Sequence, residues 1–336
     1  MNSAVLSTDF VVAGSSAKPA DAACAQSFDI SRPLEPVRRW RIHIGAHETA
    51  TPRLQRSLAA LRSELATRGV DGIPRAVGFA EALLNRPLGA RLLPLGGSLI
   101  ASRVARGIAA PLEALRRGPG TLVLSEDRLL GSPRRVFSEP FYPMAEQAAQ
   151  TLATLAGGGD GAEVTLFLSV RGFQDHLPAI YARELRALPP PAGGFEAIKR
   201  RVLARPPSWF DLVRRLRAAA PGVSLRVWRH EDHAAHSEAI LSAFVGCDAG
   251  TSAPPLAEAA PDDWPPPIEA IREAEALPAD LAQPARRALV DEIFAAAGPG
   301  TPFRPFSAAE RCAFEAAYAA DLDRIAALDP RILIRP

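Results

Sequence analysis

The sequence predicts an α/β protein built on a doubly wound parallel sheet flanked by helices. Four short apolar segments have the length and the aliphatic, β-branched content of buried strands, and helical patterns lie between them. Strands that alternate with helices pair in parallel, because the helix carries the chain back across the sheet. The expected strands are 40–45 (WRIHIG), 121–126 (TLVLSE), 163–170 (EVTLFLSV) and 224–231 (SLRVWRHE).

The helices expected after the first and third strands, and before the fourth, each carry one apolar stripe at helical spacing. Residues 76–118 are also mostly helical in pattern and contain no clear strand. The stripes consist of Leu54, Leu58, Leu61 and Leu65, then Leu177, Ile180, Tyr181 and Leu185, and then Phe210, Leu212, Val213 and Leu216.

Composition divides the chain into three parts. Residues 1–36 are rich in Ser, Ala and Asp and are expected to form a disordered tail; without a basic n-region and an apolar h-region, they do not predict a secretory signal. Residues 37–250 are the expected α/β domain. Residues 251–336 form a proline-rich linker and a helical C-terminal extension, whose last helix begins with a capping-box pair, Ser307 and Glu310.

The net charge, the cysteine spacing and the length of the apolar runs argue against several classes of protein. A formal net charge of +2 over 336 residues gives no electrostatic case for a nucleic-acid partner. Cys24, Cys247 and Cys312 are far apart and form no CxxC pair, which fits a reducing cytoplasm and argues against a thiolate zinc site. No apolar run approaches the roughly 20 residues that a membrane span needs. We therefore expect a cytoplasmic protein, of an oligomeric state that the sequence does not reveal.

The segment after the first expected strand has the layout of a phosphate cradle. The loop GAHETATP, from Gly45 to Pro52, leaves a strand and enters a helix, so its N–H groups and the helix dipole favour an anion. Thr49 and Thr51 offer hydroxyl groups, and Pro52 suits the first helical turn with Thr51 as its cap. The pattern alone leaves open a plain turn that only packs.

Four segments together resemble the bacterial sulfotransferase-like family. IHIGAHETATPRLQRSL is similar to its first motif, in which a His-Ile-Gly-x-His-Lys-Thr-x-Thr-type loop cradles the 5′-phosphosulfate of 3′-phosphoadenosine 5′-phosphosulfate (PAPS). LFLSVRGFQDHLPAIYARELR resembles the second motif, in which an arginine after a strand and a serine on the next helix bind the 3′-phosphate. LVLSEDRLLG and VWRHEDH match in place and character, so the resemblance covers residues 41–236 and implies a P-loop-type fold.

The resemblance implies a donor-binding set for PAPS or its product PAP, with two departures. Glu48 stands at the position of the lysine, and Ala179 stands at that of the serine, while Ser169 lies just before Arg171, the match for the 3′-phosphate arginine. Ala50 occupies a position where glycine is common. The implied set is Gly45, Ala46, His47, Glu48, Thr49, Ala50, Thr51, Arg53, Ser169 and Arg171.

Glu48 is the serious departure. A lysine there would neutralise donor charge and stabilise the leaving oxygen, whereas a carboxylate adds a like charge unless it points away or is protonated. Arg53 or Arg41 could compensate, because arginine binds phosphate bidentately.

A transferase also needs a base within reach of the acceptor proton. His47, Glu126 and Asp127 are the candidates, the two acids because they follow a strand at the expected active edge. The alternatives are a histidine bonded to the loop backbone and acids that cap a turn. The spacing of His230, His233 and His236 suits a shared helical face only loosely, so we expect no metal site, and we interpret the four tryptophans as packing residues.

These patterns lead to two hypotheses of different classes. The first is a sulfotransferase that moves a sulfuryl group from PAPS to a hydroxyl or amine of a small-molecule or glycan acceptor, without a metal. The second is a catalytically inactive homologue that serves as a nucleotide-binding or scaffold module. A P-loop kinase is disfavoured, because the chain has no Gly-x-x-x-x-Gly-Lys-Ser/Thr loop.

Overall fold

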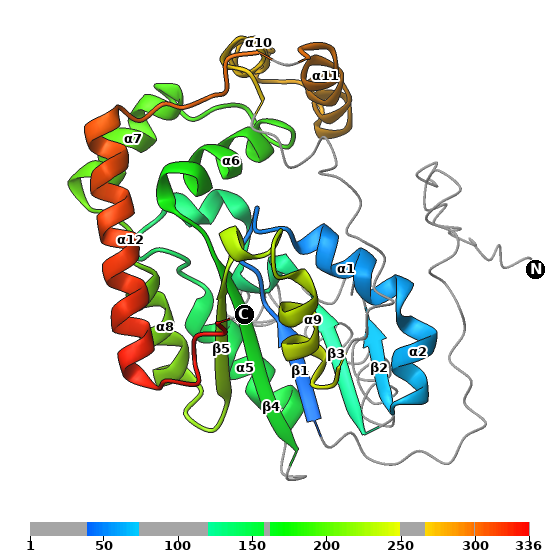
Figure 1. Ribbon diagram of the computed structural model, residues 1–336. Helices are drawn as coiled ribbons and strands as arrows, with labels where there is room; N and C mark the ends of the chain where they lie inside the picture. The colour runs from blue at the N-terminus through cyan, green and yellow to red at the C-terminus, as the bar shows by residue number, and fades with distance from the viewer. Residues whose placement is uncertain (1–38, 74–119, 158–161, 249–265, 299, 336) are drawn as a thin grey trace, which may run out of the picture. The chain divides into compact units, whose positions relative to one another are not determined.

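A five-stranded parallel sheet forms the centre of the protein (Figure 1). The computed structural model describes residues 39–73, 120–157, 162–248, 266–298 and 300–335, which belong to one compact unit. The strand order is β2-β3-β1-β4-β5, and each neighbouring pair is parallel. The strands are β1 (Arg39–His43), β2 (Val70–Ile73), β3 (Thr121–Ser125), β4 (Glu163–Val170) and β5 (Ser224–Arg229).

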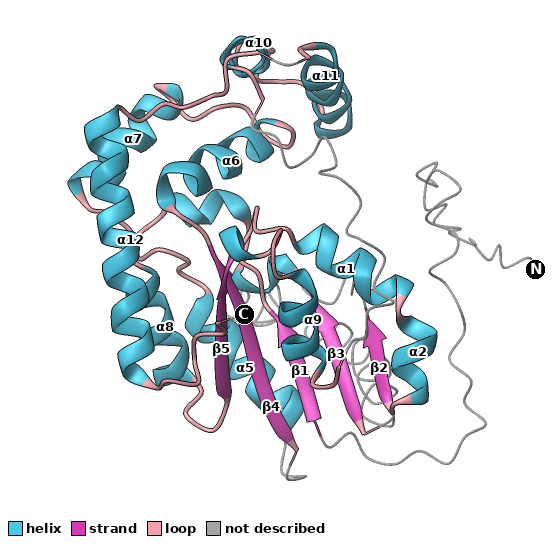
Figure 2. Cartoon of the chain, viewed as in Figure 1, coloured by secondary structure: helices cyan, strands magenta, loops and turns pink. Residues whose placement is uncertain are grey.

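Helices cover both faces of the sheet, as the doubly wound arrangement requires; Figure 2 shows α9 in front of the strands and α5 behind them. One face carries α1 (Thr51–Ala60), α2 (Arg62–Thr67) and α9 (Ser237–Val245). The other carries α5 (Ala145–Gly157), α6 (Phe173–Leu185) and α8 (Trp209–Ala219), with α12 (Ala308–Leu328) packed against α6 and α8. The remaining elements are α7 (Gly194–Ala204), α10 (Ile268–Glu275), α11 (Gln283–Ala296) and the 3-10 turns η2 (Asp127–Leu130), η3 (Pro133–Phe137) and η4 (His230–Asp232).

Alternation along β1 assigns its side chains to the two faces. Trp40 and Ile42 lie in the core shared with α5, α6 and α8. His43 stacks instead on Trp228, which belongs to the smaller core under α1, α2 and α9. Successive side chains of a strand point to opposite faces, so one short strand supplies both cores.

The four expected strands are confirmed, each ending within two residues of its predicted limits. The stripe from Leu54 to Leu65 is buried as expected, but it runs over two helices, because the chain breaks at Leu61. Strand β2 was missed: VDGI is four residues long, contains an acid and a glycine, and has little intrinsic strand preference. It pairs with β3 at the edge of the sheet.

Two predicted helix starts were tested. Ser307 and Glu310 form the expected reciprocal capping box. The prediction of Thr51 as a cap is wrong, because the cap of α1 is Ala50 in the left-handed region and Thr51 is already helical. The expected tail (1–36), the helical region 76–118 and most of the proline-rich segment 253–267 lie outside the described residues. Within the described part of the chain, no helix is long and apolar enough to span a bilayer.

Candidate functional site

The loop between β1 and α1 lies at the carboxyl ends of the central strands, where α/β proteins commonly bind ligands. Its first residues are fixed to the end of β4: the N–H of Ala46 donates to the carbonyl of Ser169 (3.1 Å), and the N–H of Ser169 donates to that of Gly45 (2.7 Å). On the other side, the N–H of Glu126 donates to the carbonyl of His43 (3.0 Å). Residues at the carboxyl ends of β1, β3 and β4 therefore meet at this loop.

The backbone of this loop is unusually curved. Gly45 (φ 108°), Glu48 (φ 54°) and Ala50 (φ 63°) all have positive φ. A side chain at Gly45 would also place a Cβ 3.1 Å from the carbonyl oxygen of Asp127, so this position requires glycine. Ala50 adopts a left-handed conformation in which glycine would be unstrained.

The curved backbone leaves several N–H and hydroxyl groups of the loop without a hydrogen-bond partner in the described chain. The N–H groups of Glu48, Ala50 and Thr51 donate to no acceptor among the described residues. The Thr49 hydroxyl donates to the carbonyl of Ala46 (2.7 Å) and closes the loop on itself. The hydroxyls of Thr51 and Ser169 are buried and have no partner in the described chain. Unpaired N–H groups at a helix start and buried unpaired hydroxyls are what an anion site needs.

Glu48 forms an ion pair that the sequence did not reveal. Arg183, on α6, donates from Nη1 to a Glu48 carboxylate oxygen (3.0 Å) and also to Asp127 (2.8 Å). Burial disfavours the charge of Arg183, but the two carboxylates outweigh it and raise its pKa. Burial raises the pKa of Glu48 in spite of the arginine. Burial also opposes ionisation of Asp127, but Arg183 and His47 hold its pKa below the usual range.

A weak signal for Arg183 was present in the sequence. It lies four residues after Ala179, which puts both on one face of α6. An arginine one helical turn beyond Ala179, together with an acid in the loop, suggests such a pair. Its partners lie 56 and 135 residues away along the chain, so no local pattern could identify them.

The predicted arginines divide between two places. Arg171 lies at the loop, where Nη1 donates to the carbonyl of Glu48 (2.8 Å). Arg53 lies in the first turn of α1, and its N–H donates to the carbonyl of Ala50 (3.0 Å). Arg41 is engaged away from the loop: its guanidinium donates to two carbonyls at the end of α9 (2.5 Å each).

The three candidate bases lie around the same loop. His47 is fully buried, and its Nδ1 is 3.2 Å from the hydroxyl of Tyr142. Burial lowers the pKa of His47 to about 4, so its imidazole is neutral at neutral pH. Glu126 caps η2 by accepting from the N–H of Arg128 (3.1 Å), the alternative that the sequence left open. Burial, followed by Asp127, raises the pKa of Glu126.

Other predicted residues have structural roles. Glu231 accepts from the N–H of Gly172 (2.9 Å) and from the hydroxyl of Tyr318 (2.9 Å), which joins the starts of η4 and α6 to α12. Trp40, Trp209 and Trp228 are buried in the core, as expected of packing residues, and Trp264 lies outside the described residues. Among the residues described, no group of His, Cys, Asp and Glu side chains has the geometry of a metal site.

Comparison with known proteins adds no relative: neither any protein-family model nor any curated protein matches this chain. The chemistry of the site therefore rests on its own residues.

Proposed function

We propose that this chain is a sulfotransferase-like protein of the P-loop type, which binds the 5′-phosphosulfate end of PAPS in the loop Gly45–Thr51. The observation that carries the proposal is the set of polar groups at this loop. Three N–H groups of the loop have no acceptor in the described chain, two buried hydroxyls have no partner there, and Arg171 lies beside them. Phosphate and sulfate oxygens would satisfy these groups.

The proposed reaction is transfer of the sulfuryl group to a hydroxyl or amine acceptor. The acceptor atom forms a bond to sulfur, the bond from sulfur to the bridging oxygen breaks, and PAP leaves with the electron pair. The acceptor proton goes to a base, for which the neutral ring of His47 is suited by its protonation state. In place of the lysine, the cation paired with the Glu48 carboxylate is Arg183.

The charge balance at the loop limits this activity. Arg183 is shared by two carboxylates, Glu48 and Asp127, so these three groups together carry one net negative charge when ionised. Such a cluster stabilises a leaving phosphate less well than a free lysine, since preorganised positive charge is the main electrostatic aid to group transfer. Protonation of Glu48, whose pKa is raised by burial, would remove the excess negative charge.

This same cluster favours the second candidate function, a nucleotide-binding module without transfer activity. A guanidinium held by two acids fixes the loop and α6 together, which is a structural role. In that case the N–H groups and Arg171 still bind PAP, but no cation assists the departure of the leaving group.

Calorimetric titration of PAP and PAPS, together with PAP release from PAPS, tests both candidates. We expect micromolar binding by the parent, at least tenfold weaker binding by Arg171→Ala, and tighter binding by Glu48→Lys. The exposed Arg287→Ala on α11 is the matched control and should bind like the parent. PAPS turnover by the parent supports the transferase, whereas turnover by Glu48→Lys alone supports the inactive module. Failure of the parent and of Glu48→Lys to bind either nucleotide would refute the donor site.

A further inference from the structure

A cluster of arginines surrounds a cavity at the amino-terminal ends of β4 and β5. This is the end of the sheet opposite to the loop. The cavity has a volume of about 650 Å³, in the range of small-molecule sites. It includes the first residues of β4 and β5, Glu163 and Ser224, whereas the Gly45–Thr51 loop meets the last residues of β4. Strand β4 has eight residues, so its ends lie roughly 23 Å apart at a rise of ~3.3 Å per residue. The two sites are separate.

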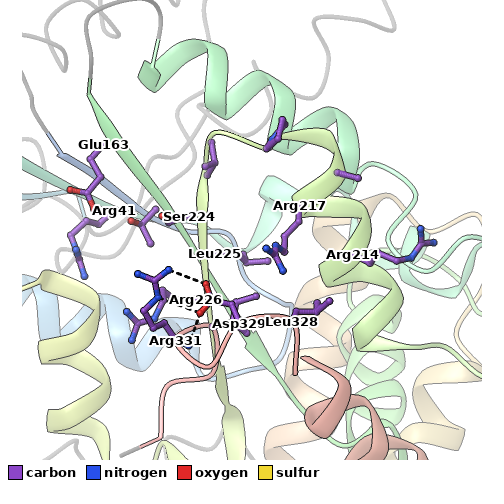
Figure 3. A pocket seen from close by; sticks show the side chains of 15 residues that line it. Arg41, Glu163, Arg214, Arg217, Ser224, Leu225, Arg226, Leu328, Asp329 and Arg331 are labelled. Carbon is purple, nitrogen blue, oxygen red and sulfur yellow. Dashed lines mark hydrogen bonds and ion pairs between the residues drawn. The ribbon is translucent and has the colours of Figure 1, made fainter. Parts of the chain in front are cut away.

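Positive charge dominates the lining of this cavity. Five arginines and only two acids, Glu163 and Asp329, line it, and Arg214 is paired with Asp211 outside the lining (2.8 Å), which leaves a surplus of two positive charges. Figure 3 shows the labelled arginines around the start of β5, with Arg214 at the margin. The arginines are Arg41, Arg214, Arg217, Arg226 and Arg331.

Two of these five arginines are not held by a hydrogen bond or close ion pair that would account for the position of the guanidinium group. Arg331 pairs with Asp329 (3.3 Å), and Arg41 donates to carbonyls at the end of α9. Arg226 has a buried Nε without a hydrogen-bond partner among the described residues. Arg217 has no hydrogen bond or close ion pair in the described chain, and its charge acts at longer range on Asp329, the acid that Arg331 binds. Burial, and then the like charges of Arg226 and Arg39, lower the pKa of Arg41, although Glu163 acts against them.

The cavity walls are held by long-range contacts. The segment after α12 pairs with the middle of β5: the N–H of Val227 donates to the carbonyl of Ile332 (2.7 Å), and the N–H of Ile334 donates to that of Val227 (2.7 Å). This bridge sets Asp329 and Arg331 beside the start of β5. Apolar side chains, among them Leu225 and Leu328, line the remainder.

From this arrangement we propose that the cavity is a binding site for a small organic molecule with at least two phosphate groups, separate from the donor loop. Arginine forks bind phosphate oxygens in pairs, and two guanidinium groups without a close partner in one cavity suit two phosphates. The hydroxyls of Thr165 and Ser224 add donors, and the apolar wall suits an organic core. The inference does not depend on PAPS binding at the loop.

The test uses inorganic pyrophosphate as the probe, titrated calorimetrically into the full chain at about 150 mM salt, where weak surface attraction is screened. We expect Arg217→Gln/Arg226→Gln to weaken one pyrophosphate-binding event at least tenfold. Arg171→Gln, which alters the loop, and Arg287→Gln, an exposed control, should leave that event unchanged. Unfolding in urea confirms that each variant is folded.

Three outcomes would overturn the proposal. One is pyrophosphate binding that does not respond to the double substitution in a folded variant. Another is binding that disappears completely in Arg171→Gln, which would assign it to the loop. The third is citrate binding more tightly than pyrophosphate with the same dependence on Arg217 and Arg226, which would make the ligand a carboxylate.

Discussion

Three buried histidines near the loop should make the folded protein sensitive to mild acid. His43, His47 and His176 are fully buried. Burial lowers the pKa of His43 to about 3 and that of His47 to about 4, and it lowers the pKa of His176 well below 6.5. In the unfolded chain these rings titrate near 6.5, so below that pH the unfolded state binds protons that the folded state does not. Their contribution to stability is complete above pH 6.5 and is lost as the pH falls.

The magnitude follows from linkage. For one histidine that is protonated only when unfolded, lowering the pH from 7.5 to 5.5 removes about 1.3 kcal/mol from the free energy of unfolding. Three such histidines remove about 4 kcal/mol, a large part of the stability of an ordinary domain. Glu48, Glu126 and Glu184 act in the opposite sense, since their raised pKa values favour the folded state at lower pH. The change in the unfolding free energy of the whole protein is therefore the difference between two opposing effects. A test must follow the contribution of a single residue.

The substitution His176→Phe isolates one histidine. Both ring nitrogens of His176 lack a partner among the described residues, and its ring lies 5.1 Å from Trp209 and 6.4 Å from Phe141. A phenyl ring keeps these aromatic contacts without a group that titrates. We expect the free energy of unfolding of the variant to gain about 1.3 kcal/mol relative to the parent between pH 7.5 and pH 5.5.

Urea denaturation followed by tryptophan fluorescence at pH 7.5, 6.5 and 5.5 measures this difference. The exposed Arg287→Gln on α11 serves as the control and should follow the parent at every pH. If the unfolding free energies of His176→Phe and the parent change in parallel with pH, His176 is not a buried neutral histidine and the reasoning is refuted.

The other two predictions concern two arginines that join distant segments of the chain. Arg183→Met should lower the unfolding free energy by ~2 kcal/mol, less than for a fully buried pair because the side chain is about one third exposed. Adding Glu48→Gln should recover part of the loss in urea denaturation, and a strictly additive double variant would contradict the pairing. Arg286 is buried and donates to three main-chain carbonyls, on α6, on α10 and in the turn after α10 (3.0–3.2 Å). Arg286→Met should cost about 2–4 kcal/mol and speed hydrogen exchange in α11 first, while unchanged exchange there would show that these hydrogen bonds do not hold the helix.

Local patterns predicted most of the α/β core. Strands such as 163–170 are recognisable because burial on both faces of a parallel sheet demands a continuous apolar run. Helix starts were predictable where a side chain makes the cap, as at Ser307, but not at Ala50, where the loop conformation and not a side chain begins the helix. The sequence did not predict strand β2, because its pairing with β3, and not its composition, makes it a strand.

For the site, the sequence by itself determined the loop and its residues, since Gly45, Thr49, Thr51 and the following helix are contiguous. It also showed that the loop carries an acid, Glu48. Only the tertiary structure decided which cation pairs with that acid, because Arg183, which Glu48 shares with Asp127, reaches it from a distant part of the chain. The cavity lined by arginines is likewise a product of packing. Hydrophobic periodicity is a local property of the chain, whereas ion pairs and cavities depend on which distant segments the sheet brings together.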